Sequence, residues 1–396
     1  MKILFYSHFF APSVGGVENI TRSLADGLSK RRKPDGETEF ALTLVTQTAA
    51  GDFDDDTLPF RVVRSPNLIE LWRLIRQSEV VHLAGPALAP LLLALLLRKP
   101  VVVEHHNYQA ICPNGRLVHQ PDHSVCPGHF QARHFAECVR CQANEISWIA
   151  SLMNLLWMFP RYVLTRAAAQ NIAVTQHVLE RHALPRSSVI YHGIEGSGDD
   201  CRADRSGSAR SAHETISFAY VGRFISEKGI PILLAASKTL ADEGRFFTVK
   251  LIGDGPERPK IEEIIRRERL GHYVQITGYL TGAALAGVLC RVDAVVLPSV
   301  CEETAGLSLI EQMMRGRAVI ASDIGGLAEV VGDAGLKCAP GDAHALAACM
   351  RKVLEEPSLL DALGEKGRHR ARLYFARERM IEEYARVYRH VLSRTA

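Results

Sequence analysis

The sequence predicts an α/β protein made of two doubly wound, Rossmann-like domains that face a central cleft. Short apolar strands alternate with helical patterns along most of the 396 residues, which is typical of parallel sheets covered by helices. The chain is also too long for one ordinary hydrophobic core. A polar, glycine-rich segment at 196–214 divides the strands into two series, so we expect a linker or surface loop there.

The expected strands fall into two groups that define the domain boundaries. The first group lies at 2–8, 41–47, 80–85, 100–106 and 171–175. The second group lies at 216–222, 248–255, 273–278, 293–299 and 318–323. We therefore expect a first domain at 1–195, a second domain at 215–375, and an amphipathic helix within 376–396.

Charge and hydropathy argue against two classes of protein. A formal net charge of +3, with no run of Lys or Arg, argues against a nucleic-acid partner. The apolar runs at 87–97 and 148–159 are shorter than the ~20 residues of a membrane-spanning helix. The first residues, MKILFYSH, predict a strand and not a signal peptide, and the odd number of cysteines, nine, favours reduced thiols. We expect a cytoplasmic protein.

The segment CEETAGLSLIEQMMRG (301–316) predicts a ligand site at the start of a helix. The N–H groups of Gly306 and Leu307, after a strand and a loop, suit a phosphate. Glu303 and Glu311 would repel a phosphate, so they fit hydroxyl groups instead. A nucleotide sugar has both kinds of group, and we expect Glu311 to bind its ribose and Glu303 its sugar.

A second turn in the same domain would supply the positive charge that a diphosphate needs. GRFISEKG (222–229) follows the first strand of the second series and contains Arg223 and Lys228. Arginine offers a bidentate fork and lysine a point charge. The ordinary alternatives are that the glutamates complement a helix dipole and that the cations are solvated.

These segments resemble those of a known family. GRFISEKG, LIGDGPER (251–258) and the block around Glu303 and Glu311 are similar to motifs of the retaining glycosyltransferases of family 4, which have the GT-B fold. The resemblance implies that Arg223 and Lys228 hold the donor diphosphate and that Glu303 and Glu311 hold its sugar and ribose. It also implies an acceptor-binding first domain, a donor-binding second domain, and a final helix that packs back on the first.

The function implied is transfer of a sugar from a nucleotide diphosphate sugar, with retained anomeric configuration. The acceptor would be a glycan or a polyprenyl-linked saccharide, as in polysaccharide biosynthesis, and we expect neither a cofactor nor a catalytic metal. Two alternatives remain at this stage. A sugar-nucleotide epimerase would use the same donor groups, and a non-catalytic membrane-associated module would leave them without a role.

The first domain contains three further candidate groups for function. Gly15 and Gly16, between a strand and a helix, permit close approach of a phosphate or sugar. Two histidines end the strand at 100–106; the resemblance favours His106 over His105 as the functional one, with a structural role as the alternative for each.

An irregular insertion at about 110–145 contains Cys112, Cys126, Cys138 and Cys141. One C-x-x-C pair suits a structural zinc ion, whereas the loose remaining spacing suits free thiols. The next segment, 146–164, is rich in Trp and bordered by Arg. It is either an amphipathic helix at the inner face of a membrane or part of a core.

Overall fold

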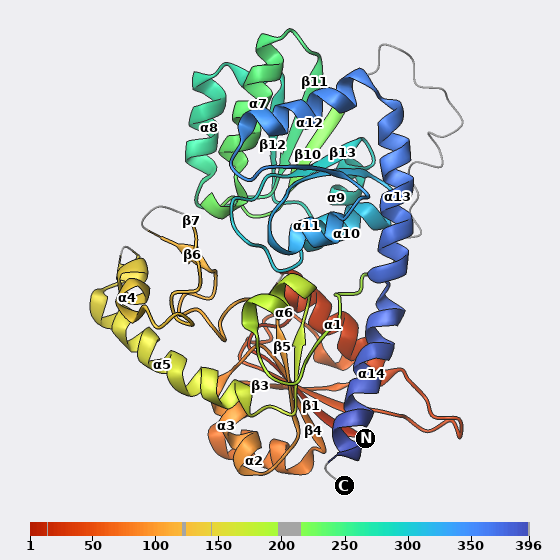
Figure 1. The fold of residues 1–396 in the computed structure, drawn as a ribbon. Coiled ribbons are helices and arrows are strands. Elements are labelled where there is room, and N and C mark those ends of the chain that lie inside the picture. The colour runs from red at the N-terminus through yellow and green to blue at the C-terminus, as the bar shows by residue number, and fades with distance from the viewer. Residues whose placement is uncertain (14, 121–123, 144, 197–214, 395–396) are drawn as a thin grey trace. The chain divides into compact units, whose positions relative to one another are not determined.

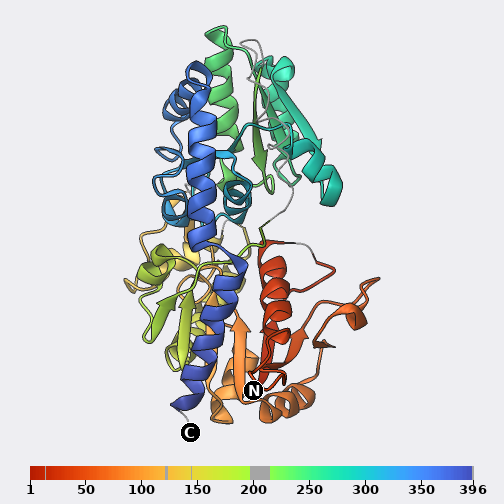
Figure 2. The ribbon, with the colours of Figure 1, turned by 90° about the vertical axis from the view of Figure 1, so that its right-hand side faces the viewer.

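The computed structural model describes residues 1–13, 15–120, 124–143, 145–196 and 215–394. The chain forms two compact units, of which the first comprises Met1–Glu195 with Phe375–Ala396 and the second Gly196–Tyr374. Each unit is a parallel sheet between helices (Figures 1 and 2). The α/β fold class predicted from the alternating pattern is therefore confirmed. Apart from Gly196, the expected linker lies outside the described residues.

The first unit contains a seven-stranded sheet in which every strand runs parallel to its neighbours. The order is β3 (Arg61–Arg64), β2 (Ala41–Thr46), β1 (Lys2–Ser7), β4 (Val80–Ala84), β5 (Val101–His105), β8 (Gln170–Ala173) and β9 (Ser187–Val189). The helices between strands are α1 (Gly16–Ser29), α2 (Leu68–Gln77), α3 (Leu88–Leu96), α5 (Trp148–Arg166) and α6 (Gln176–His182). Central strands such as β5 are buried along their whole length, as expected for strands covered on both faces.

The second unit repeats this plan with a six-stranded parallel sheet. Its order is β12 (Val274–Gly278), β11 (Phe247–Ile252), β10 (Ile216–Val221), β13 (Ala294–Leu297), β14 (Ala318–Ser322) and β15 (Leu336–Cys338). The helices are α7 (Ile230–Asp242), α8 (Arg258–Arg267), α9 (Gly282–Leu289), α10 (Leu307–Met314), α11 (Gly325–Val331), α12 (Ala343–Glu355) and α13 (Ser358–Tyr374). The strand order reverses between β10 and β13, and such switch points are where doubly wound sheets bind ligands.

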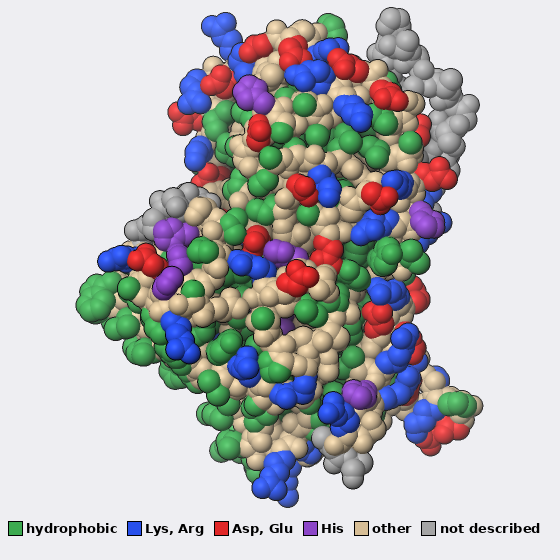
Figure 3. All heavy atoms as spheres, viewed as in Figure 1, with side chains coloured by type: hydrophobic (Ala, Val, Ile, Leu, Met, Phe, Trp, Pro, Cys, Tyr) green, Lys and Arg blue, Asp and Glu red, His purple; other side chains and the backbone are tan. Residues whose placement is uncertain are grey.

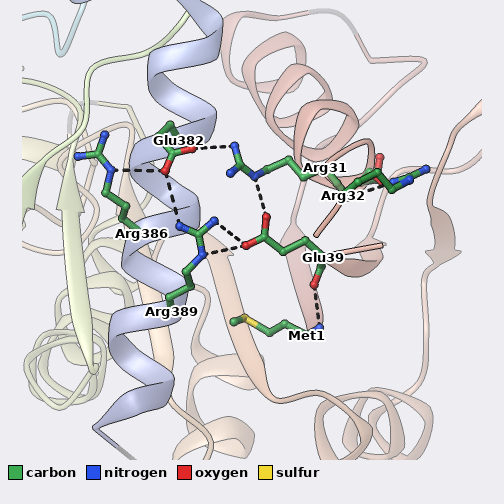
Figure 4. Close-up of polar contacts among 8 residues, drawn as sticks. Met1, Arg31, Arg32, Glu39, Glu382, Arg386 and Arg389 are labelled. Carbon is green, nitrogen blue, oxygen red and sulfur yellow. Dashed lines mark hydrogen bonds and ion pairs between the residues drawn. The ribbon is translucent and has the colours of Figure 1, made fainter. Parts of the chain in front are cut away.

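The last helix, α14 (Arg377–Ser393), belongs to the first unit although it ends the chain. It packs on α1, and ion pairs hold it there. Arg31, just after α1, contacts Glu382 at 2.8 Å, and Arg389 contacts Glu39 (Figure 4). Arg377 contacts Asp26 at 2.6 Å.

Three strands of the two sheets were absent from the predicted set: β3, β9 and β15. All three are edge strands of three or four residues. An edge strand has one neighbour and need not be continuously apolar, so the apolar runs that revealed the central strands are missing. The insertion contains α4 (Phe135–Ala143) and a small hairpin of β6 (Val118–His119) and β7 (Ser124–Val125). In the part of the chain that the structure describes, no helix is both long and apolar enough to cross a membrane.

Candidate active site

Two loops meet at the switch point of the second unit, one after β10 and one after β13. The backbone N–H of Val300 donates to the carbonyl of Glu227 at 2.9 Å. Gly229 has a φ of 66°, and a Cβ there would lie 2.0 Å from the carbonyl oxygen of Pro298. Only glycine permits this conformation and approach together. The two segments that the sequence singled out are thus held side by side.

This contact brings Lys228 and Glu303 together. Lys228 Nζ lies 2.7 Å from Glu303 Oε2, and both side chains are largely covered. Ser299 Oγ donates to the other carboxylate oxygen, Oε1, and the N–H of Gly326 donates to the Glu303 carbonyl at 2.7 Å. Glu303 is therefore held in place through both its side chain and its backbone.

A helix N-terminus faces the same loop. The helix α10 begins at Leu307, next to the start that we expect near Gly306, and its N-cap Gly306, at a φ of 65°, provides no side-chain cap. A helix start without such a cap leaves first-turn N–H groups for another acceptor. Glu311 lies one turn further on, and burial raises its pKa, while the nearby charge of Arg315 opposes that rise. Hydroxyl groups that donate hydrogen bonds to a half-buried carboxylate of this kind would stabilise its charged form.

Arg223 is exposed at the start of the first loop. Its carbonyl accepts a hydrogen bond of 2.8 Å from the Tyr220 hydroxyl. Burial raises the pKa of Tyr220; the charge of Glu303 adds to this rise, and that of Arg223 opposes it. Both charges therefore act on one buried phenol. The described contacts place the Arg223 backbone at the site and leave its side chain in solvent.

The first unit contains a buried network around Glu104 at the end of β5. Its carboxylate lies 3.3 Å from His82 Nε2, 3.4 Å from His106 Nε2 and 3.4 Å from His192 Nε2. His106 Nδ1 and His192 Nε2 are 3.2 Å apart. The hydroxyl of Tyr388, on α14, lies 2.8 Å from His82 Nδ1. The network thus extends from the final helix to His106.

Protonation in this network follows from its burial. Desolvation lowers the pKa of His106 to about 4, although the charge of Glu104 opposes this. The pKa of Glu104 lies well below its usual value, because the histidines outweigh the effect of burial. His106 is therefore neutral near pH 7 and suited to hydrogen bonding. Among the described residues, Glu104, His106 and His192 are also spaced closely enough to surround a metal ion.

Gly15 and Gly16 lie at the start of α1, with Gly15 as the N-cap. The carboxylate of Glu18 folds back over this position, since a Cβ on Gly15 would lie 2.2 Å from Glu18 Oε2. Ser13 Oγ also contacts Glu18, at 3.4 Å. A carboxylate at this helix start disfavours a phosphate and favours hydroxyl groups. Of the two ligands that the sequence left open here, the sugar is the better fit.

Sequence reasoning missed four of the residues that complete these groups: Ser299, Glu18, His82 and Glu104. The sequence could have indicated Glu18, because an acidic residue in a first helical turn is a common partner of the helix start. No sequence pattern indicates Ser299 or Glu104, since their partners depend on loop geometry and on strand pairing. The predicted residues also divide between the units: Gly15, Gly16 and His106 belong to the first, and the donor set to the second.

Comparison with known proteins finds a family match within the second unit. Residues 215–356 match the family model of Glycosyl transferases group 1. Over 141 residues the chain is 37% identical to 2-deoxystreptamine glucosyltransferase from Streptomyces kanamyceticus, covering 35% of this chain and 36% of that protein. Over 230 residues it is 31% identical to glycogen synthase from Mycobacterium tuberculosis, covering 57% and 53%. These alignments span about a third to a half of the relatives' lengths.

The fold likeness extends over the whole chain. The structure of Anabaena Alr3699/HepE in complex with UDP aligns with a TM-score of 0.72 at 17% identity, covering 98% of this chain and 100% of that one. The GT-B fold is thereby confirmed. The segment that matches the group 1 glycosyl transferase model includes Arg223, Lys228, Glu303, Gly306 and Glu311. The histidine network and the glycines of the first unit lie outside that segment.

Proposed function

We propose that the protein is a retaining glycosyltransferase that transfers a sugar from a nucleotide diphosphate sugar to an acceptor. The main support is the Lys228–Glu303 pair at 2.7 Å, beside the uncapped start of α10. Cation, carboxylate and helix N-terminus together suit a ligand that has a diphosphate next to hydroxyl groups. The family match over 215–356 supports the same class of reaction.

In this proposal the ion pair marks the junction between the diphosphate and the sugar. Lys228 would bind a phosphate oxygen and Glu303 a sugar hydroxyl, so that both charges keep partners when the donor enters. Arg223, exposed at the loop start, would close on the diphosphate, and the N–H groups at Gly306 and Leu307 would bind it directly. Glu311 would accept from the ribose. Catalysis would come mainly from stabilising the departing diphosphate.

The first unit is proposed to bind the acceptor. His106 is neutral and buried in a network that fixes its ring, so it would orient a hydroxyl group and not carry a charge. Glu18 beside Gly15 would accept from acceptor hydroxyls. No cofactor enters this proposal.

The outer helices of the first unit support a lipid-linked acceptor. The helix α5 exposes large apolar side chains, with Trp148 63% and Trp157 54% exposed. The helix α3 packs beside α5, and α2 packs beside α3. These two helices add exposed side chains such as Ile69 and Leu96. Figure 3 shows apolar side chains gathered over α5 and α3, with Lys and Arg among them. We call the exposed apolar side chains of α2, α3 and α5 the outer apolar face.

Such a face suits the interface of an anionic bilayer. Aromatic and aliphatic side chains would enter the headgroup region, and arginines such as Arg73, Arg76 and Arg166, which are exposed beside them, would contact lipid phosphates. The acceptor would then be a polyprenyl-linked saccharide or membrane-anchored glycan. We propose a cytoplasmic protein that binds peripherally to the inner membrane face.

The decisive experiment measures binding and transfer with defined donors. Thermal shifts against UDP, GDP, ADP and their sugars should identify one base, because a ligand at 100 times its dissociation constant adds ~2.7 kcal/mol to stability. Nuclear magnetic resonance of the product should then show the donor's anomeric configuration. A new sugar nucleotide formed from donor alone would instead support the epimerase. If no nucleotide bound, the non-catalytic membrane-associated module would be the remaining alternative.

A further inference from the structure

We propose that the insertion of the first unit contains a structural zinc site whose ligands are Cys112, Cys126, Cys138 and Cys141. This site is separate from the donor and acceptor groups and has no role in the transfer reaction. The inference rests on the burial of the four thiols, on the hydrogen bonds that reach their sulfur atoms, and on the sparse structure of the segment that contains them.

All four side chains are free thiols and all are buried, each 6 or 7% exposed. They come from four places in the insertion: a turn after β5, the end of β7, and two successive turns of α4. Cys138 and Cys141 are three residues apart on that helix, so their side chains lie on one face. The spacing C-x13-C-x11-C-x2-C thus brings two separate cysteines to a helical C-x-x-C pair.

Polar groups are directed at these sulfur atoms. The N–H of Gln120 donates to Cys141 Sγ at 3.4 Å, and Asn114 Nδ2 approaches the same sulfur at 3.6 Å. The Cys112 thiol donates to the other end of that amide, Asn114 Oδ1, at 2.9 Å, so one side chain joins two of the thiols. Cys141 thus accepts from N–H groups of the kind that support a metal-bound thiolate, whereas a cysteine that only fills an apolar core needs no such donors.

The backbone at the start of β6 brings Cys126 close to Cys141. The N–H of Cys126 donates to the carbonyl of Leu117 at 2.7 Å, and the Cys141 thiol donates to the carbonyl of Val118 at 3.4 Å. Because Leu117 and Val118 are consecutive, both cysteines contact the same stretch of backbone, and Cys138 shares one face of α4 with Cys141. A divalent cation would bind these thiols in their ionised form.

The insertion contains little regular structure and little apolar packing that could stabilise it. Between β5 and α5 the regular structure consists of two-residue strands β6 and β7 and the nine-residue α4. One small apolar cluster joins Phe130 and Cys138 to Leu155 and Met158 of α5. Small irregular segments of this kind commonly depend on a metal for their folding energy.

The four sulfur atoms are spread more widely than the ligands of a bound zinc ion. Among the described residues, no three of the four sulfur atoms lie within 4.8 Å of one another. Zinc–sulfur bonds of about 2.3 Å in a tetrahedron place ligand sulfurs roughly 3.8 Å apart. Zinc would therefore draw the turn at Cys112, the strand end at Cys126 and α4 closer together.

The first test is the metal content of the full-length chain, purified without chelators. We expect about one zinc per chain by mass spectrometry, and cobalt substitution should give the thiolate charge-transfer bands of a tetrahedral sulfur site. Cys112→Ser, Cys126→Ser, Cys138→Ser and Cys141→Ser should each reduce the bands and the zinc content. Cys349→Ser, which changes a free thiol on α12 of the second unit, should change neither.

A second measurement keeps the proposal testable if the serine variants fail to fold. In the wild-type protein, a zinc chelator should make the four thiols reactive to an alkylating reagent, while Cys338 and Cys349 react as before. Absence of stoichiometric zinc, together with alkylation that does not depend on chelator, would overturn the site. Zinc that is lost in His192→Gln but kept in the cysteine variants would place the ion at Glu104, His106 and His192 instead.

Discussion

The two units have the same doubly wound plan but place their charged groups differently. In the second unit, Lys228 and Glu303 pair in partly open loops at the switch point of the sheet. In the first, Glu104 and its histidines are buried between β5 and α14. Partly open charges can exchange one partner for another when a ligand arrives, whereas buried groups are fixed by their surroundings. This difference agrees with the proposal that the second unit binds the charged donor and the first orients neutral groups.

The largest expected effect is a difference in acid stability between the units. Burial lowers the pKa of His105 and His106 to about 4 and that of His182 to about 3. Below pH 6.5 these histidines take up protons in the unfolded chain but not in the native one, so stability falls as pH drops from 6.5 towards 4. At ~1.4 kcal/mol for each pKa unit, the first unit should lose several kcal/mol.

Tryptophan emission measures this loss selectively, because Trp72, Trp148 and Trp157 are the only tryptophans and all lie in the first unit. Urea unfolding followed by emission should shift to lower urea between pH 6.5 and pH 4. Amide exchange of peptides from β13 and β14, corrected for the intrinsic pH dependence, is the control and should change less. Equal loss in both units would contradict the assignment to the buried histidines.

The second prediction concerns the donor cations of the second unit. Lys228→Ala and Arg223→Ala each remove a charge-assisted contact worth ~1.5–3 kcal/mol, which is a loss of about 10- to 150-fold in donor affinity. Calorimetric titration with the preferred nucleotide diphosphate measures it. Lys238→Ala is the matched control, since Lys238 pairs with Asp242 on α7. Unchanged binding in both loop variants would show that the diphosphate does not bind at this site.

The third prediction separates the two carboxylates of the same unit. Glu311→Ala should weaken the binding of the free nucleotide and of the complete donor alike, by ~1–3 kcal/mol, because the variant loses the ribose contact. Glu303→Ala should weaken the binding of the sugar-bearing donor only. Competition binding with free nucleotide and intact donor measures both. If Glu303→Ala affected the free nucleotide as strongly as Glu311→Ala, the proposed order of sugar and ribose would be wrong.

The smallest effect concerns the outer apolar face of the first unit. Trp148→Ser with Trp157→Ser should lower binding to anionic vesicles several-fold and leave donor affinity unchanged. Phe159 is a poorer choice, because its ring packs on Phe130 and Phe135. Phe246→Ser offers the matched control, since Phe246 is 84% exposed in the second unit.

Vesicle sedimentation measures this effect, and thermal melting of the same variants checks the fold. Lost melting stability with unchanged vesicle binding would show a core role for the tryptophans. Lost vesicle binding in Phe246→Ser as well would show that any exposed aromatic residue suffices. In either case the acceptor would more simply be soluble.

The candidate donor groups could be placed at a strand end and a helix start because they lie in short contiguous segments. Arg223 and Lys228 are five residues apart, and Glu303, Gly306 and Glu311 span nine residues. Local spacing with respect to a strand end and a helix start therefore determines where they lie. The central strands are equally local, since burial on both faces requires continuous apolar runs.

Contacts between distant segments were decided by the tertiary structure alone. The pairing of Lys228 with Glu303 depends on Gly229 approaching the carbonyl of Pro298. The bond between Tyr388 and His82 joins residues 306 positions apart, and that between His106 and His192 joins residues 86 apart. The sequence by itself determined where the candidate donor residues lie relative to strand ends and helix starts. The fold decided which of them meet, because strand order and helix packing bring together side chains that no spacing along the chain relates.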